Sequence, residues 1–335
     1  MAVLDAKYPT LFDLSQRMTP EGSIETDIVE MLNSTNEILD DMVWQEGNLI
    51  TGHKSTIRTG LPSPTWRKLY GGVQPSKSAT RQITDNCGNL EDYSRIDRDL
   101  AMLNGNSAAW RMTEDAAHIE GISQELAETI FYGDEGVDEA KFTGLVPRFN
   151  DPTAENGSQL INAGNTTGTL QSIWLVVWGP RSLFGIVPKG SRSGIEMRDL
   201  GEDTVAAPDG NGLMQALTTH YKVQAGLTVR DWRYVARICN IDVDTLKAHP
   251  TVGTDVVLPD LMYSAMERVQ NLNGRAAFYM SRSVREKVRQ QTVNLTSNST
   301  LSMENVGGKM LMNFQGIPMK RVDALATDET VITFA

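Results

Sequence analysis

The feature that most constrains the fold is a helical pattern of about 26 residues between Ser107 and Tyr132. Apolar residues recur there at spacings of three and four, which places them on one face of an α-helix. These residues are Met112, Ala116, Ile119, Ile122, Leu126 and Ile130. At 1.5 Å per residue the helix is roughly 39 Å long, so the fold must accommodate one elongated element. Gly133 is placed to end it.

The opposite face of this helix is acidic. It carries Glu114, Asp115, Glu120, Glu125 and Glu128. Between Met112 and Ala140 the chain has nine acidic residues and no Lys or Arg. Like charges on one face repel one another, which lowers stability unless a cationic surface covers them. The pattern therefore predicts a basic partner, and these five acids are candidates for a subunit interface.

A segment of the opposite character lies upstream, at residues 48–86. Short alternating runs of Thr, Ile, Val and aromatic residues are separated there by "LPSPT" and "YGGVQP", which is typical of strands joined by turns. Asp85 is its only acid. The interface candidates in it are Lys54, Arg58, Trp66, Arg67, Lys68, Lys77 and Arg81. A hairpin this polar cannot build its own core, so it is expected to lie on another surface.

The acidic helix and the basic hairpin are expected to meet either within one chain or between neighbouring copies. The second alternative is favoured, because a monomer normally protects an extended strand edge. Self-association is therefore the first functional prediction.

The rest of the chain predicts a mixture of strands and helices, and hence an α+β fold class. A helix is expected to begin at Ile24 after Ser23 as N-cap, with apolar positions as far as Met42 and a stop at Gly47. An apolar strand is expected at "LQSIWLVVWG". The stretch "HYKVQAGLTVRDWRYVARICNID" alternates in two phases, which fits a hairpin or one long bulged strand. "PDLMYSAMERVQNL" and "SRSVREKVRQQ" are predicted helices, the second capped by Ser281 or Ser283. "AAFYM" is a predicted strand, and the chain is expected to end with strand, turn, strand and a final strand.

Composition limits the functional classes. A chain of 335 residues exceeds the size of one hydrophobic core, so two lobes or an elaborated domain are expected. The net charge of −11 argues against tight, sequence-independent binding of nucleic acid, which needs a cationic face. Neither a secretory leader nor a membrane span is expected from the apolar runs. Two distant cysteines, Cys87 and Cys239, are typical of a reducing cytosol.

No motif predicts catalysis, a cofactor or a metal site. The four histidines are scattered, and none stands at a zinc-protease spacing. "GIVPKGSRSG" has Lys189 before the glycine and so lacks the order of a phosphate loop. "DEGVDEAKFTGL" has Glu139 where a calcium loop needs glycine and Leu145 where it needs a bidentate Glu. The prediction is a protein without enzymatic activity, with a carboxylate-dependent hydrolase as the enzyme alternative because acids are abundant.

The order of the segments resembles a known family. An arm and helix, "SIETDIVEMLNSTNEILDDMVWQEGN", come first, and the basic hairpin "TGHKSTIRTGLPSPTWRKLYGGVQPSKS" comes next. The acidic helix closes in "IFYGDEG", and "PKGSRSGIEMRDLG", "DWRYVARICNID", "AAFYMSRSVREKVRQQ" and "FQGIP" come later. In this order the chain resembles a major capsid protein of a tailed bacteriophage with the Hong Kong 97-like fold. It is most similar to the capsid subfamily of short-tailed and related phages.

The resemblance implies a layout along the chain. The parts are an N-terminal arm and helix (1–46), an extended β-hairpin loop (47–86), a peripheral domain (87–149) with its spine helix (107–132), linking strands and loops (150–218), long peripheral-domain β-strands (219–245) and an axial domain (246–335). The long strands stand mid-chain, which suggests a permuted strand order. No scaffolding extension precedes the arm, so a separate scaffolding protein is expected. No Asn motif matches those that crosslink to a loop Lys, so no covalent crosslink is expected.

The resemblance also implies a function. Copies would associate into hexamers and pentamers that form an icosahedral head around the double-stranded DNA genome of a tailed phage. The expected partners are further copies, a scaffolding protein, a portal and a decoration protein, with no membrane and no sequence-specific DNA binding. The expected location is the virion, after assembly in the cytoplasm of the host bacterium. An encapsulin-like shell around protein cargo is the alternative within the same fold.

Overall fold

The computed structural model describes residues 36–102, 107–207, 212–251, 253–295, 301–306 and 309–334. Within them the chain forms two compact units, each assembled from segments that are distant in sequence. The first unit comprises residues 89–127 and 193–224, and the second unit comprises the described parts of 35–88, 128–192 and 225–335. Strands and helices are both abundant, so the predicted α+β class is confirmed. The domain boundaries and the permuted strand order stay predictions.

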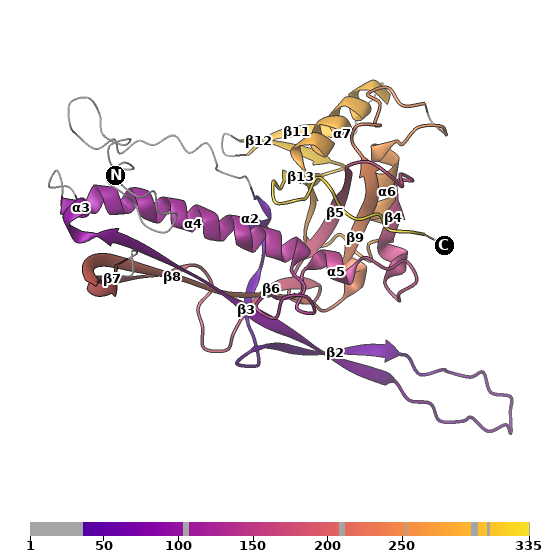
Figure 1. The fold of residues 1–335 in the computed structure, drawn as a ribbon. Coiled ribbons are helices and arrows are strands. Elements are labelled where there is room, and N and C mark those ends of the chain that lie inside the picture. The colour runs from indigo at the N-terminus through magenta and orange to yellow at the C-terminus, as the bar shows by residue number, and fades with distance from the viewer. Residues whose placement is uncertain are drawn as a thin grey trace. The chain divides into compact units, whose positions relative to one another are not determined.

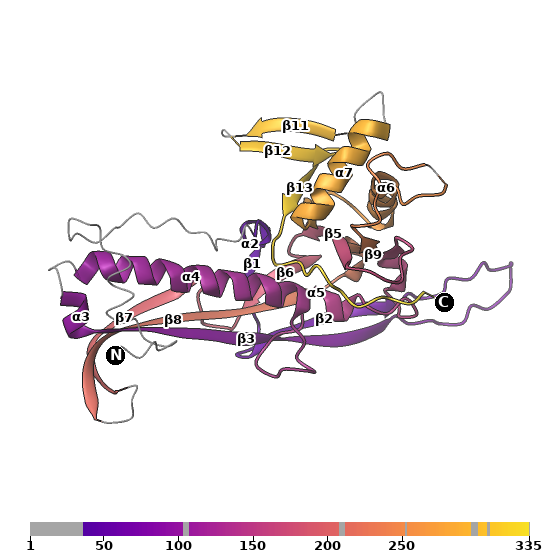
Figure 2. The ribbon, with the colours of Figure 1, turned by 45° about the horizontal axis from the view of Figure 1, so that its top comes forward.

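The second unit is built on a sheet whose central strand is β5 (Leu170–Trp178), in which every residue is buried. A strand covered on both faces has an almost continuous apolar run, which explains "LQSIWLVVW". β5 pairs antiparallel with β9 (Val235–Asp242) and with β10 (Arg275–Met280). Beyond β10 the sheet continues with β13 (Ile317–Arg321), β12 (Lys309–Phe314) and β11 (Leu301–Val306). Figure 2 shows β11 and β12 as a hairpin.

Short strands extend this sheet at two places. β6 (Leu183–Val187) comes after β5 and has β1 (Trp44–Glu46) as a parallel neighbour. β4 (Leu160–Asn162) lies parallel to β9 and comes directly after the single turn η2 (Gly157–Gln159). Segments that are more than 100 residues apart along the chain therefore lie side by side in one sheet.

Two helices pack on this sheet (Figure 1). α6 (Leu258–Arg268) has a proline in its first turn, and α7 (Arg282–Leu295) begins after Ser281, whose Oγ accepts a hydrogen bond from the Val284 N–H at 3.3 Å. The predictions of both helices, of the Ser281 cap and of β10 are confirmed. Their apolar sides form one core with the sheet, and it includes Leu258, Met262, Phe278, Val284 and Val288. Burial of each such side chain contributes about 1.5–3 kcal/mol.

The first unit contains parts of several long elements. β7 (Glu196–Ala206) pairs antiparallel with β8 (Leu213–Val229) along its whole length. β3 (Ala79–Asp97) is the next strand beside β8, and the short helix α3 (Arg98–Met102) comes directly after it. Residues 225–229 of β8 belong to the second unit, where residues 226–229 pair with β6.

The predicted long helix is confirmed as α4 (Ser107–Tyr132), with Gly133 directly after it. Its apolar stripe is exposed at Met112 and Ile119 in the first half of the helix and buried towards its end. Among the described residues Met112 is 75% exposed and Ile119 is 37% exposed, whereas Ile130 is fully buried. Periodicity shows that one face of a helix is apolar, but it does not say how far a covering surface extends along that face.

The basic hairpin is also confirmed, although its second strand is longer than predicted. β2 (Gly52–Gly60) pairs antiparallel with the first part of β3. β3 then continues to Asp97 instead of ending at residue 86. The continuation is hard to see in the sequence because its half-buried positions mix polar and apolar residues without a clear alternation. Residues 61–78, which we call the hairpin tip, connect the two strands.

Three other expectations need correction. The helix predicted to run from Ile24 to a stop at Gly47 lies outside the described residues up to position 35. The residues after that form one helical turn, α2 (Ile38–Asp41), as predicted, but residues 44–46 form strand β1 instead of helix. Pairing of β1 with β6 overrides the local helical pattern there. Residues 219–242 form neither a hairpin nor one bulged strand, because β8 and β9 have different partners and are joined by the turn η3 (Trp232–Tyr234). No strand comes after β13 within the described chain.

A buried polar network anchors α2 to the sheet of the second unit. Asp41 is 5% exposed, and its carboxylate accepts hydrogen bonds from the Tyr279 hydroxyl and the Lys320 ammonium, each at 2.6 Å. Tyr279 in turn accepts a hydrogen bond from the indole N–H of Trp178 at 2.7 Å. A buried carboxylate is costly unless it is paired, and both oxygens of Asp41 are satisfied here. Burial, together with the neighbouring Asp41 charge, raises the pKa of Tyr279 well above its usual value.

A second buried network holds the segment after β13. The Arg237 guanidinium forms an ion pair of 2.9 Å with Glu329, and both side chains are almost fully buried. Glu329 also accepts hydrogen bonds from the hydroxyls of Tyr132, at 2.6 Å, and Ser172. Further along, the Asn240 amide donates to the Ile332 carbonyl oxygen at 2.8 Å and accepts from its N–H at 3.0 Å. Side-chain partners thus replace the strand pairing that the sequence pattern predicts for this segment.

Candidate subunit interface

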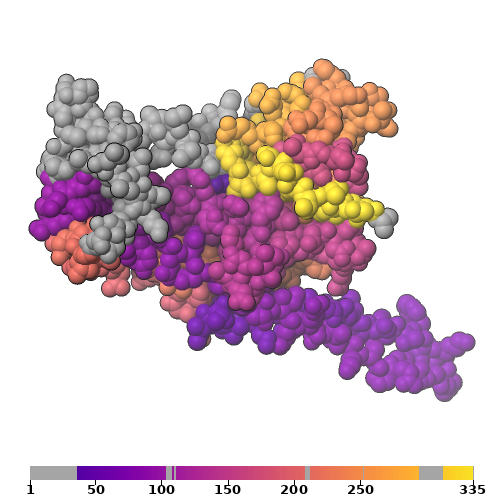
Figure 3. All heavy atoms as spheres, viewed as in Figure 1, coloured from indigo at the N-terminus to yellow at the C-terminus, as the bar shows by residue number. Residues whose placement is uncertain are grey.

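The hairpin tip projects from the rest of the second unit in Figure 3. It carries large apolar side chains that the described residues leave uncovered. Trp66 and Tyr70 are fully exposed. The complete set of exposed large apolar residues in the tip is Leu61, Trp66, Leu69, Tyr70 and Val73. Apolar groups clustered at one exposed place mark an interaction surface, whereas single exposed residues do not. Aromatic residues in addition supply much of the binding energy at protein interfaces.

The cations predicted for the interface are on the same hairpin, and all of them are exposed. They are Lys54, Arg58, Arg67, Lys68, Lys77 and Arg81. None forms an ion pair with another described residue. Cations spread along an extended hairpin can attract an acidic surface and set the register of contact. The assignment of these six residues and of Trp66 to a subunit interface stays a prediction.

The root of the hairpin is held firmly within the second unit. Asp85 is buried and forms an ion pair of 2.8 Å with Arg148, at the end of the short helix α5 (Leu145–Arg148). Arg148 also donates to the Leu227 carbonyl oxygen at 3.2 Å. Gly226 lets β8 approach the hairpin, because an added Cβ would stand only 2.7 Å from the Asn86 carbonyl oxygen. The hairpin is therefore fixed at its base. A fixed hairpin loses less conformational entropy on binding a partner than a flexible loop does.

The predicted acidic face of α4 is more engaged than the sequence suggests. Asp115 accepts a hydrogen bond from the Tyr221 hydroxyl, and Glu120 accepts one from Gln124 at 2.7 Å. Glu114 and Glu125 are half-buried, and Glu128 is exposed. These acids meet partners within the subunit, so the predicted charge match with a neighbour rests chiefly on the exposed members. That match stays a prediction.

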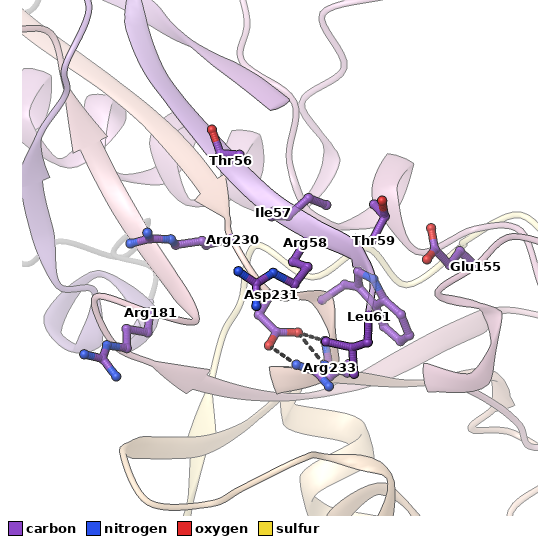
Figure 4. Close-up of a pocket in the computed structure, with 11 residues that line it drawn as sticks. Thr56, Ile57, Arg58, Thr59, Leu61, Glu155, Arg181, Arg230, Asp231 and Arg233 are labelled. Atoms are coloured by element: carbon purple, nitrogen blue, oxygen red, sulfur yellow. Dashed lines mark hydrogen bonds and ion pairs between the residues drawn. The ribbon is translucent and has the colours of Figure 1, made fainter. Parts of the chain in front are cut away.

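Sequence reasoning missed a second group of cations, which lines a hollow of about 570 Å³ beside the end of β2 that leads into the hairpin tip (Figure 4). Arg58 of β2 lies there with Arg181, Arg230 and Arg233. The last three come from two turns, between β5 and β6 and between β8 and β9. The fragment "RDWR" is the one local signal, since it places cations on both sides of an acid. Nothing in the sequence indicates that Arg181 joins them.

His53, beside this hollow, makes the stability of the subunit dependent on pH. Burial lowers the pKa of His53 below 6.5, and the nearby Arg230 lowers it further while Asp85 opposes the shift. Its ring packs edge-on against Phe184 with centroids 5.5 Å apart. Because the unfolded chain binds this proton more readily, the contribution of His53 is present above pH 6.5 and is lost as the pH falls. We expect the free energy of unfolding of His53→Gln, measured with urea, to change less between neutral and mildly acidic pH than that of the parent. Equal changes in both proteins would contradict this.

The described part of the chain also has properties that bear on metal binding, thiol chemistry and membrane insertion. No group of three or more His, Cys, Asp or Glu side chains is arranged there to hold a metal ion. Burial raises the pKa of Cys87 and of Cys239 to about 11, so both thiols are protonated at neutral pH. None of the described helices combines the length and the apolar character that crossing a bilayer requires.

Solved structures share this fold. A chain of bacteriophage Epsilon15 aligns with a TM-score of 0.78 and 30% sequence identity, covering 99% of this chain and 100% of that one. The capsid of bacteriophage JBD30 aligns with a TM-score of 0.55 and 9% identity, covering 91% and 96% of the two chains, which is a likeness of fold alone. The class that the fold defines is the phage capsid subunit with the Hong Kong 97-like architecture, as the sequence predicts.

Within this class, the chain belongs to the family of the major capsid protein GP7, whose model matches residues 19–333. It is a structural protein that assembles with copies of itself into the capsid shell of a virion. No curated protein matches the chain. The predictions of capsid fold, structural role, self-assembly and virion location are confirmed.

Proposed function

We propose that the subunits form hexamers and pentamers, and that these tile a closed icosahedral head around the double-stranded DNA of a tailed phage. The observation that carries the proposal is the uncovered hairpin on its rigid root, with an apolar tip and six cations that form no ion pair with another described residue. A surface of this kind gains stability only when a neighbour covers it. Repetition of the same contact around a symmetry axis then turns individually modest interfaces into a closed ring.

In this proposal each part of the chain has a mechanical role. The extended loop, residues 47–86, lies across a neighbouring subunit, with its cations facing acids of the neighbour's spine helix. The arm at 1–46 and the peripheral domain at 87–149 contribute contacts between capsomers. The axial domain at 246–335 meets its copies at the capsomer centre. The net charge of −11 supports a shell lining that contains packed DNA without gripping it.

The proposed partners are a separate scaffolding protein, a portal and a decoration protein, with assembly in the cytoplasm of the host bacterium. We propose no catalytic activity and no covalent crosslinks between subunits. Of the alternatives, the hydrolase would require that Glu114, Glu120 or Glu125 be essential for a turnover. The encapsulin-like interpretation would require closed shells around protein cargo when the chain is produced alone. Membership in a major capsid protein family supports the genome-enclosing shell over both.

Electron microscopy of the purified protein, with and without a scaffolding protein, tests the proposal. We expect closed shells with six-fold and five-fold capsomers, and we expect scaffolding to increase their yield and uniformity. Monomers or small closed oligomers under every condition would rule the shell out. Shells that form alone and enclose protein would favour the encapsulin-like alternative.

A further inference from the structure

The hollow beside the end of β2 has walls from four separate segments of the second unit. Strand β2 supplies Arg58 on one side, and the turn between β5 and β6 supplies Arg181. The connection between β8 and β9 supplies residues 230–233, and Glu155 comes from the loop before η2. We call this the arginine pocket (Figure 4).

Backbone contacts fix the arginines around this space. The Ser182 carbonyl oxygen accepts hydrogen bonds from the N–H groups of Arg230, at 2.9 Å, and Asp231, at 3.3 Å. The Ser182 hydroxyl is itself held by the Val177 carbonyl oxygen at 2.7 Å. Asp231 caps η3 by accepting the Arg233 N–H at 3.1 Å. The two turns that carry these side chains are therefore bound to each other.

The charges in the pocket do not balance. Asp231 binds the Arg233 guanidinium through two hydrogen bonds, of 2.9 and 2.8 Å, so these two charges cancel. The remaining charged residues of the lining are then Arg58, Arg181 and Arg230, against one acid, Glu155. Among the described residues Arg58 and Arg181 have no ion pair, and Arg230 makes only a 3.5 Å contact with the Pro180 carbonyl oxygen. Three guanidinium groups around one concave space attract an anion and repel one another without it.

The lining also indicates whether the anionic group belongs to a protein segment or to nucleic acid. Ile57, Leu61 and Trp232 contribute apolar surface beside the arginines. A segment that matches both features needs an apolar side chain next to carboxylates. Continuous phosphate backbone, by contrast, offers no apolar group and would meet the carboxylates of Glu155 and Asp231.

The chain itself has a segment of this composition in the turn 134–139, "DEGVDE". Its shape is set locally, since the Asp134 carbonyl oxygen accepts hydrogen bonds from the N–H groups of Val137, at 3.1 Å, and Asp138, at 2.9 Å. Val137 is 86% exposed, and the Asp138 and Glu139 side chains beside it are exposed as well. Glu139 forms no hydrogen bond or ion pair with another described residue.

We propose that the arginine pocket of one subunit receives the turn 134–139 of a second copy. Val137 packs against the apolar wall, and the carboxylate of Glu139 meets Arg181 and Arg230. The inference rests on the proposed assembly through subunit contacts, and it adds a specific second contact to the one made by the hairpin tip.

Charge reversal on each side, and on both sides together, tests the pairing. We expect Arg181→Glu and Glu139→Arg each to lower the fraction of assembled shells by about tenfold or more, because each places like charges in contact. The double variant restores the opposite pairing, so its assembled fraction is expected to return to near that of the parent. Arg192→Glu is the matched control, since Arg192 is exposed, belongs to the same unit and lies outside the pocket. Sedimentation measures the assembled fraction, and urea unfolding checks that each variant is folded.

The outcomes separate the alternatives. Single variants that assemble like the control would overturn the pocket as a contact site. A double variant no better than the single ones would overturn the turn 134–139 as its occupant. Normal shells that package less DNA would assign the pocket to phosphate instead. If the parent chain forms no shells, the proposed function fails before this test begins.

Discussion

Replacing Trp66 and Tyr70 together by alanine is expected to abolish shell assembly while leaving the isolated subunit as stable as the parent. Both side chains are fully exposed, so the subunit loses no packing when they are truncated. In an interface, each aromatic anchor contributes about 2 kcal/mol or more, so two of them weaken every contact by roughly a thousandfold. The loss recurs at each hairpin of the shell, and no symmetric arrangement can avoid it.

Sedimentation velocity and electron microscopy measure this loss, and urea unfolding of the unassembled subunit measures the stability. Ile50→Ala is the matched control, since Ile50 is 81% exposed but lies before β2 and outside the tip. The control is expected to assemble normally. Shells from the double variant at the parental yield would show that the tip is not an anchor. A large fall in subunit stability would show instead that the tip packs within its own chain.

Glu329→Ala is expected to destabilise the subunit by about 3–5 kcal/mol, the cost of leaving a buried charge unpaired. Its partner Arg237 is 2% exposed and has its guanidinium 5.0 Å above the Trp174 ring. Arg237 keeps a hydrogen bond of 2.7 Å to the Phe149 carbonyl oxygen, which does not neutralise its charge. Loss of the Glu329 carboxylate also leaves the Tyr132 hydroxyl without its acceptor. The segment after β13 is then expected to be held less firmly, because its contacts of Ile332 with Asn240 remain but its buried ion pair is lost.

Urea unfolding of the unassembled subunit measures this change as well. Glu202→Ala removes an ion pair with Arg98 in which both side chains are nearly half exposed, and it is expected to cost less than about 1 kcal/mol. Glu329→Gln keeps the shape and the hydrogen-bond acceptor, so an intermediate loss is expected. A cost for Glu329→Ala as small as that of the control would mean that water reaches Arg237 and solvates it.

Local patterns predicted much of the secondary structure. The bounds of α4 and the positions of β5, β10, α6 and α7 can be read from periodicity and capping, which depend on residues close together in the chain. Predictions failed where a distant segment overrides the local pattern. β1 replaces helix because β6 lies beside it, and β8 and β9 separate because each has its own neighbours.

The residues of the candidate interface likewise fall into those that local sequence predicts and those that it does not. The hairpin tip was predictable, because a polar hairpin without a core must expose its aromatic and cationic residues whatever surrounds it. Arg181 and Arg230 carried no such signal, and neither did the buried pair of Arg237 and Glu329. Their partners are tens of residues away along the chain, and one exposed arginine looks like another in a sequence.

By itself the sequence determined the α+β class, the long acidic helix, the basic hairpin and the resemblance to a capsid subunit. Each of these is a property of composition or of spacing within one segment. Only the tertiary structure decided which half of α4 is buried, where the last residues are held and which arginines surround one pocket. Those features arise from contacts between residues far apart in the chain, and their energies depend on distance and burial in three dimensions.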